Sequence, residues 1–125
     1  MTDARSYRFP RSRRLSGRRA FGRVFQARAK KNVGPLAIHA LPNQLSHPRL
    51  GLSVSRKVGN AVARNRVKRL LREAFRLSQH DWPRGYDIVV VVYPHELLTL
   101  ADYQRILFSG VRSMHLTWTR RSAKQ

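Results

Sequence analysis

The sequence predicts one small α+β domain, a sandwich in which three helices lie on a mixed sheet. The chain has 125 residues, a length that suits a single domain. Short apolar runs alternate with amphipathic segments in the order helix, strands, helix, strand, helix. The strand–helix–strand unit in the middle implies two parallel neighbouring strands in one sheet.

The expected elements follow from periodicity and from Gly, Pro and Asn punctuation. In chain order they are a helix over residues 17–27, a turn or short edge strand over 30–35, strands over 36–41 and 50–55, a helix from 59–60 to about 78, a strand over 87–93 and a helix over 100–115. Leu36, Ile38 and Ala40 fall on one face of their strand, with His39 and Leu41 on the other. In the strand over residues 87–93, every residue after Asp87 is apolar, as expected for a strand covered on both faces.

The ends of the elements are predicted from capping patterns. Ser16 is expected as the N-cap of the first helix, and Thr99 with Asp102 forms a capping pair for the last one. We expect a basic arm over residues 1–16, a single folded domain over residues 17–116 and a frayed basic tail over residues 117–125.

Charge is the most unusual property of the chain. Lys and Arg number 26 against 6 Asp and Glu, a formal net charge of +20. So many like charges oppose compaction, and a polyanion such as RNA offsets that cost because it releases counterions on binding. A merely soluble basic protein is disfavoured, since ordinary surfaces mix both signs.

Other composition features narrow the class. The chain has no cysteine, which excludes disulfides and thiolate metal sites and suits a reducing cytoplasm. No apolar run approaches the ~18 residues of a membrane span, so no membrane partner is expected. The Arg-rich residues 1–19 resemble an organelle transit peptide, although a basic arm on an RNA-binding protein has the same composition.

The helix over residues 61–76 divides into two arcs. Its apolar arc consists of Ala63, Val67, Leu70, Leu71, Ala74 and Phe75. Its basic arc consists of Arg64, Lys68, Arg69, Arg72 and Arg76, with Asn65 in the middle and Arg66 beyond its edge. Glu73 is the only carboxylate on the helix, whereas a helix selected for stability alone would interleave Glu with Arg. This imbalance favours contact with RNA or DNA over a solvated charged face.

Neighbouring residues extend this basic surface. Asn65 is a poor helix former, and a hydrogen bond to phosphate, sugar or base would explain its presence. Arg56 and Lys57 precede the helix, and the free amides near Asn60 and Ala61 offer a further anion site.

Residues 51–75 read GLSVSRKVGNAVARNRVKRLLREAF. This stretch resembles the protein subunit of bacterial ribonuclease P, whose hallmark Arg-Asn-Arg falls on Arg64, Asn65 and Arg66. The resemblance covers residues 15–111 and is closest over residues 50–76. It implies an α+β fold like the second domain of ribosomal protein S5, with a left-handed crossover through this helix, against the usual right-handed rule.

The resemblance also implies a function. The family removes the 5′ leader of precursor tRNA, and its RNA subunit carries the catalysis with magnesium. The implied partners are ribonuclease P RNA, bound one-to-one, and the precursor tRNA leader, in the cytoplasm. The residues expected to contact the RNA subunit are Arg56, Lys57, Asn60, Arg64, Asn65, Arg66, Lys68, Arg69 and Arg72.

Family members hold the leader in a cleft between the first helix and the sheet. The two helix aromatics of that cleft fall on Phe21 and Phe25, and His39 occupies a sheet position that is often aromatic. Exposed rings stack on unpaired bases, worth ~1–3 kcal/mol each. The alternative from the residues alone is that both Phe are ordinary core residues at i, i+4. A basic residue common late in the last strand is replaced here by Val92 or Tyr93.

The chain shows no catalytic motif of its own. Its acids form no close cluster of the kind that metal-dependent cleavage needs; they are Asp3, Glu73, Asp81, Asp87, Glu96 and Asp102. Its histidines lack ligand spacing. We therefore expect no catalytic residue, and no metal or cofactor bound by the protein alone. The alternatives are a non-enzymatic ribosome-associated RNA-binding protein or RNA chaperone and, third, a metal-dependent nuclease in its own right.

Overall fold

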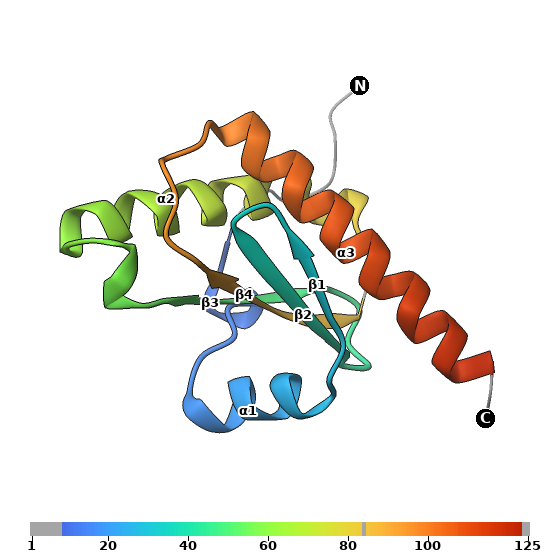
Figure 1. The fold of residues 1–125 in the computed structure, drawn as a ribbon. Helices are drawn as coiled ribbons and strands as arrows, with labels where there is room; N and C mark the ends of the chain where they lie inside the picture. The colour runs from blue at the N-terminus through green and yellow to red at the C-terminus, as the bar shows by residue number, and fades with distance from the viewer. Residues whose placement is uncertain (1–8, 84, 124–125) are drawn as a thin grey trace.

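The computed structural model describes residues 9–83 and 85–123, arranged in three layers (Figure 1). Helix α1 (Arg18–Gln26) lies below a four-stranded sheet, and α2 (Ala61–Ser78) and α3 (Leu100–Ala123) lie above it. The predicted α+β class, with three helices on a mixed sheet, is confirmed. The basic helix and the first helix therefore lie on opposite faces.

The sheet consists of β1 (Lys30–Val33), β2 (Leu36–Pro42), β3 (Arg49–Val54) and β4 (Tyr86–Val92), in the order β1-β2-β4-β3. β2 pairs antiparallel with β1 and with β4, whereas β3 and β4 are parallel. The unit β3–α2–β4 is thus the predicted parallel strand–helix–strand connection, consistent with the left-handed crossover that the resemblance implies. Residues 30–33 form a short edge strand, which resolves the choice left open for that segment.

The core lies mainly between the sheet and the pair α2 and α3. Ile88 and Val90 of β4 enter this large cluster, while Val89 enters a smaller one with Leu15 and Val24 under α1. The apolar run of β4 is therefore covered on both faces, as predicted. β2 alternates as expected, because Ile38 faces the large cluster. Gly110 of α3 lies directly against the Ile38 side chain, where a Cβ atom would collide, so the glycine allows the helix to approach the sheet closely.

Two predicted helix ends are correct. The Thr99–Asp102 capping pair forms as expected: the Asp102 amide donates to Thr99 Oγ1 at 3.1 Å, and the Thr99 amide donates to Asp102 Oδ2 at 3.3 Å. Asn60 caps α2, since its Oδ1 accepts from the Ala63 amide at 2.9 Å.

Two other predicted ends are wrong. The N-cap of α1 is Gly17, with φ 94°, instead of Ser16, and a glycine has no side chain with which to cap the first amides of the helix. Helix α3 does not end near His115 with a frayed tail; it continues to Ala123. The reason is that its last turns bind the rest of the protein, through Trp118 and Arg121.

The segment before α1 packs on the domain. The Leu15 side chain is 5% exposed, and its amide donates to Leu50 O at 2.8 Å along the outer side of β3. The ring of Phe9 lies 5.1 Å from that of Phe75 in α2. Residues 1–8 of the expected arm and residues 124–125 of the expected tail lie outside the described residues. The division into arm, domain and tail stays a prediction.

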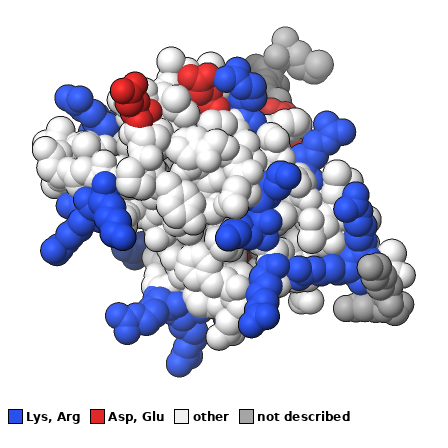
Figure 2. Space-filling view, viewed as in Figure 1, with Lys and Arg blue, Asp and Glu red and all other residues white. Residues whose placement is uncertain are grey.

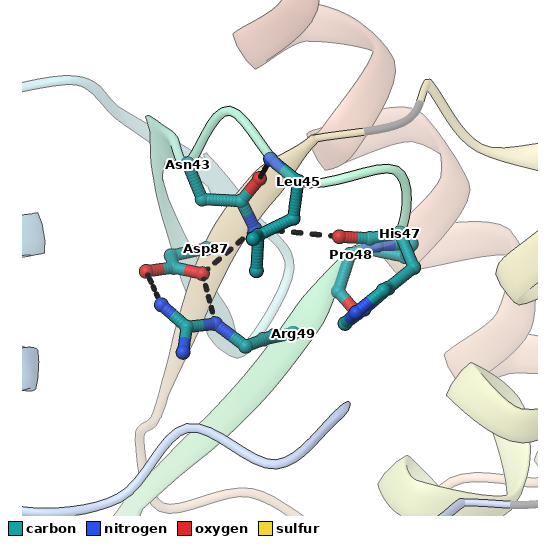
Figure 3. A network of polar contacts seen from close by, with 6 residues as sticks. All are labelled: Asn43, Leu45, His47, Pro48, Arg49 and Asp87. Carbon is teal, nitrogen blue, oxygen red and sulfur yellow. Dashed lines mark hydrogen bonds and ion pairs between the residues drawn. The ribbon is translucent and has the colours of Figure 1, made fainter. Parts of the chain in front are cut away.

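A polar network joins the loop before β3 to the start of β4 (Figure 3). Asp87, 6% exposed, accepts from Arg49 Nε and Nη2, each at 2.7 Å, and from Asn43 Nδ2 at 2.9 Å. Asn43 Oδ1 in turn accepts from the Leu45 amide at 2.8 Å. A buried carboxylate with three donors is paired and satisfied, so Asp87 has a structural role.

Candidate nucleic-acid interface

Helix α2 turns its apolar arc inward and its basic arc outward. Val67, Leu71, Ala74 and Phe75 are buried. We define the basic strip as Arg64, Asn65, Lys68, Arg69 and Arg72. Asn65, Arg69 and Arg72 are exposed, and Arg64 and Lys68 are half-buried. Arg66 is exposed next to the strip, so the structure presents every predicted residue of this helix to solvent at least in part.

The strip keeps its positive charge. Glu73, the one carboxylate of α2, accepts from Arg76 Nε at 3.0 Å and Nη2 at 2.5 Å. These hydrogen bonds lower the pKa of Glu73, which stays ionised and neutralises Arg76. Among the residues that the structure describes, no Lys or Arg of the strip forms an ion pair.

The wider surface is also cationic. Figure 2, viewed as Figure 1, shows Lys and Arg side chains spread over one face of the molecule, with Asp and Glu side chains near its top. Such a distribution produces a positive potential that attracts polyanions from a distance and weakens as salt increases.

The residues before α2 lie at its N-terminal end. Arg56 and Lys57 belong to the short 3₁₀ helix η2 (Arg56–Val58) and are exposed. Asn60 uses its side-chain oxygen to cap α2, so only its NH₂ group is available to donate to a ligand. These three residues thus lie near the N-terminal end of α2, next to the start of the basic strip.

A pocket of about 260 Å³ connects the basic strip with α1 across β3. Arg72 lines it from α2 and Phe21 lines it from α1. The ring of Phe21 lies on Gly51 of β3, where a Cβ atom would come within 2.6 Å of the ring carbons. Glycine at this position therefore allows the ring to lie on the sheet, half-buried.

Phe25 and His39 continue the aromatic surface. The Phe25 side chain is 38% exposed, and its ring meets that of His39 edge-to-face at 4.8 Å. The Phe21 and Phe25 rings are 6.4 Å apart. Burial, and then the charge of Lys30, lower the pKa of His39, so the imidazole is neutral near pH 7. We call Phe21, Phe25 and His39 the aromatic row; its two Phe are only partly buried, which argues against the reading as ordinary core residues.

Sequence reasoning missed two residues of this surface, Phe9 and Arg14. The Arg14 guanidinium lies 4.9 Å from the centre of the Phe9 ring and lines the pocket beside Arg72. Both residues also line a hollow of about 340 Å³ over the strip, together with Asn65 and Arg69. The available signal was that Phe9 and Leu15 are large apolar residues within a strongly basic arm.

Val92, the last residue of β4, and Tyr93, directly after it, differ in exposure. Val92 is 2% exposed and belongs to the large core cluster, whereas Tyr93 is 48% exposed. Tyr93 is therefore the residue that an RNA could reach.

The acidic groups are dispersed. Within residues 9–83 and 85–123, no three His, Asp or Glu side chains come together in a group that could hold a metal ion. Asp87 is bound to Arg49, and Asp102 to Arg105 at 2.5 Å. Asp3 lies outside the described residues. In the same part of the chain, no helix is long and apolar enough to cross a membrane.

The fold and this surface define a small α+β domain with a basic helix exposed on one face of its sheet and an aromatic row on the other, a combination that suits a nucleic-acid-binding protein. A family model for ribonuclease P matches residues 9–115. The chain therefore belongs to the ribonuclease P protein family.

Relatives and solved structures agree. The chain is 51% identical over 74 residues to the ribonuclease P protein component of Methylococcus capsulatus, a match that covers 58% of each chain, less than two thirds of that relative. It is 46% identical over 85 residues to that of Photorhabdus laumondii, covering 67% of this chain and 71% of the other. The fold is similar to that of the RNase P protein of Staphylococcus aureus, with TM-score 0.67 and 31% identity, and the match covers 76% of this chain and 88% of that protein. The fold is also similar to the RNase P protein of Thermotoga maritima, with TM-score 0.68 and 30% identity, and the match covers 77% of this chain and 92% of that protein.

Proposed function

We propose that this chain is the RNA-binding subunit of ribonuclease P, which assists a catalytic RNA in removing the 5′ leader from precursor tRNA. The observation that carries the proposal is the basic strip, which forms no ion pair within the part of the chain that the structure describes and is joined to the aromatic row by the pocket between Arg72 and Phe21. One surface could thus meet two RNA elements, a structured backbone and an unpaired strand.

The basic strip and its extension would bind the RNA subunit, one protein to one RNA. Guanidinium groups bind phosphates in bidentate fashion and also stack on bases, so a row of exposed Arg fits a folded RNA backbone. The residues assigned to this contact are Arg56, Lys57, Asn60, Arg64, Asn65, Arg66, Lys68, Arg69 and Arg72.

The aromatic row would hold the single-stranded leader. Base stacking on Phe21, Phe25 and His39 tolerates any sequence, because every base offers a flat face. A neutral His39 suits stacking, and Arg14 at the pocket would bind the backbone of the same strand.

The cleavage chemistry would come from the RNA subunit and its magnesium ions. This chain would reduce repulsion between two polyanions and restrict the leader near the reacting bond, which improves substrate and magnesium binding without a catalytic side chain. We expect the complex in the cytoplasm.

Reconstitution tests the proposal. Cleavage of precursor tRNA is measured against magnesium concentration with the cognate RNA alone, the protein alone, and both. We expect no cleavage by the protein alone and a lower magnesium midpoint for the complex than for the RNA alone. An unchanged midpoint contradicts the proposal.

Two other results favour the alternatives. Cleavage by RNA-free protein supports a nuclease in its own right. Recovery of ribosomal RNA instead of one abundant structured RNA, after pull-down and sequencing, supports a ribosome-associated RNA-binding protein or chaperone.

A further inference from the structure

The last turns of α3 extend beyond the family match, which ends at residue 115, yet they are firmly attached. Trp118 Nε1 donates to Ala40 O of β2 at 2.8 Å. Arg121 donates from Nη1 to Ala27 O at 2.8 Å and from Nη2 to Arg28 O at 3.0 Å. The Arg121 guanidinium also lies 4.8 Å from the centre of the Trp118 ring, so the two side chains support each other.

The hydrogen bonds of Arg121 are made to the strained turn that ends α1. The last carbonyls of a helix have no partner within it, and a cation there also offsets the helix dipole. Arg28 adopts φ 53°, a left-handed conformation that glycine usually provides at such a place. Arg121 satisfies two carbonyls of this turn at once, which explains how a non-glycine residue is held there.

The attachment points flank the aromatic row. Ala27 lies two residues after Phe25, and Ala40 directly follows His39. The pair Arg121 and Trp118 therefore connects the helix that carries one ring with the strand that carries the other.

We propose that Trp118 and Arg121 are positioning residues that hold Phe25 against His39 and so fix this end of the leader site. The proposal rests on the proposed function of the aromatic row. If it is correct, the last turns of α3 tune leader binding without touching RNA themselves.

The test compares Arg121→Ala with Arg120→Ala in the reconstituted complex. The matched control removes the same charge from an exposed neighbour. Affinity is measured for precursor tRNA, for mature tRNA without a leader, and for the RNA subunit. The leader advantage is the ratio of the affinity for precursor tRNA to that for mature tRNA. We expect Arg121→Ala to reduce this ratio roughly three- to tenfold, a part of the ~5- to 150-fold that a lost stacking contact gives. We expect Arg121→Ala and Arg120→Ala to bind the RNA subunit with the same affinity, and this equality also shows that the Arg121→Ala variant is folded.

Two further variants sharpen the result. Trp118→Phe keeps a ring but removes the N–H donor, and we expect a smaller loss in the same direction. Arg121→Lys supplies one donor nitrogen in place of two and should restore part of the leader advantage. Equal leader advantage in Arg121→Ala and Arg120→Ala overturns the proposal.

Amide hydrogen exchange in the free protein separates this proposal from the function on which it rests. Arg121→Ala should speed exchange at the end of α1 and in β2 but not in α2. If this occurs while the wild-type complex binds precursor and mature tRNA equally, the leader function fails, and the attachment through Trp118 and Arg121 has a structural role only. If exchange is unchanged, positioning by Arg121 is refuted whatever the RNA result.

Discussion

Replacing Phe25 with alanine separates the role of the aromatic row in binding from its role in stability. About three fifths of the side chain is buried, and full burial of a Phe is worth ~1.5–3 kcal/mol, so the variant should lose about 1–2 kcal/mol of unfolding free energy. A domain of this kind has about 5–15 kcal/mol, so the fold survives. Loss of one stacked base, ~1–3 kcal/mol, corresponds to a ~5- to 150-fold weaker complex with leader-bearing substrate.

The assay is equilibrium binding of the reconstituted complex to precursor tRNA and to mature tRNA. Phe108→Ala is the matched control, since Phe108 is 42% exposed but lies on α3, in the layer opposite α1. We expect Phe25→Ala to weaken precursor binding while mature tRNA binding is unchanged, and Phe108→Ala to alter neither. Equal losses for both substrates, or equal effects of the two variants, refute the reasoning.

Three more outcomes follow from the structure. Arg72→Ala should flatten the dependence of log affinity for RNA on log salt by ~0.7 per lost phosphate contact, and an unchanged slope means that Arg72 touches no phosphate. Burial lowers the pKa of His39, so the unfolded chain takes up a proton at this residue more readily than the folded chain. The unfolding free energy should therefore decrease as the pH falls below about 6.5, and urea unfolding of His39→Gln should show a smaller decrease than wild type. Asp87→Asn leaves Arg49 without its charged partner and should lower the unfolding free energy by about 2–3 kcal/mol in the same assay, and a loss well under that contradicts a structural role.

Local patterns were sufficient for most of the fold. The apolar run after Asp87 in β4 predicted a strand covered on both faces, because successive side chains of a strand point to opposite faces and all of these are apolar. The two arcs of α2 predicted which side faces the sheet, and its charge imbalance predicted the exposed strip. Both are properties of residues within one or two helical turns.

Features that depend on distant residues could not be predicted in this way. The end of α3 is set by Arg121 and its contact with Ala27, 94 positions earlier, so the tail looked unstructured on its own. Phe21 can lie on the sheet only because residue 51 is glycine. Arg14 joined the candidate site through Phe9 and Arg72, which no periodicity connects.

The two outer strands of the sheet have a consequence for the protein before it meets RNA. Unpaired strand edges invite strands from other molecules and so promote aggregation. Here β1 displays Lys30 and Lys31 to solvent, and the Leu15 amide occupies Leu50 O on β3. Repulsion between lysine side chains thus disfavours pairing at the β1 edge, and the chain's own backbone occupies part of the β3 edge. Both features help newly made copies to remain separate until a polyanion neutralises their charge.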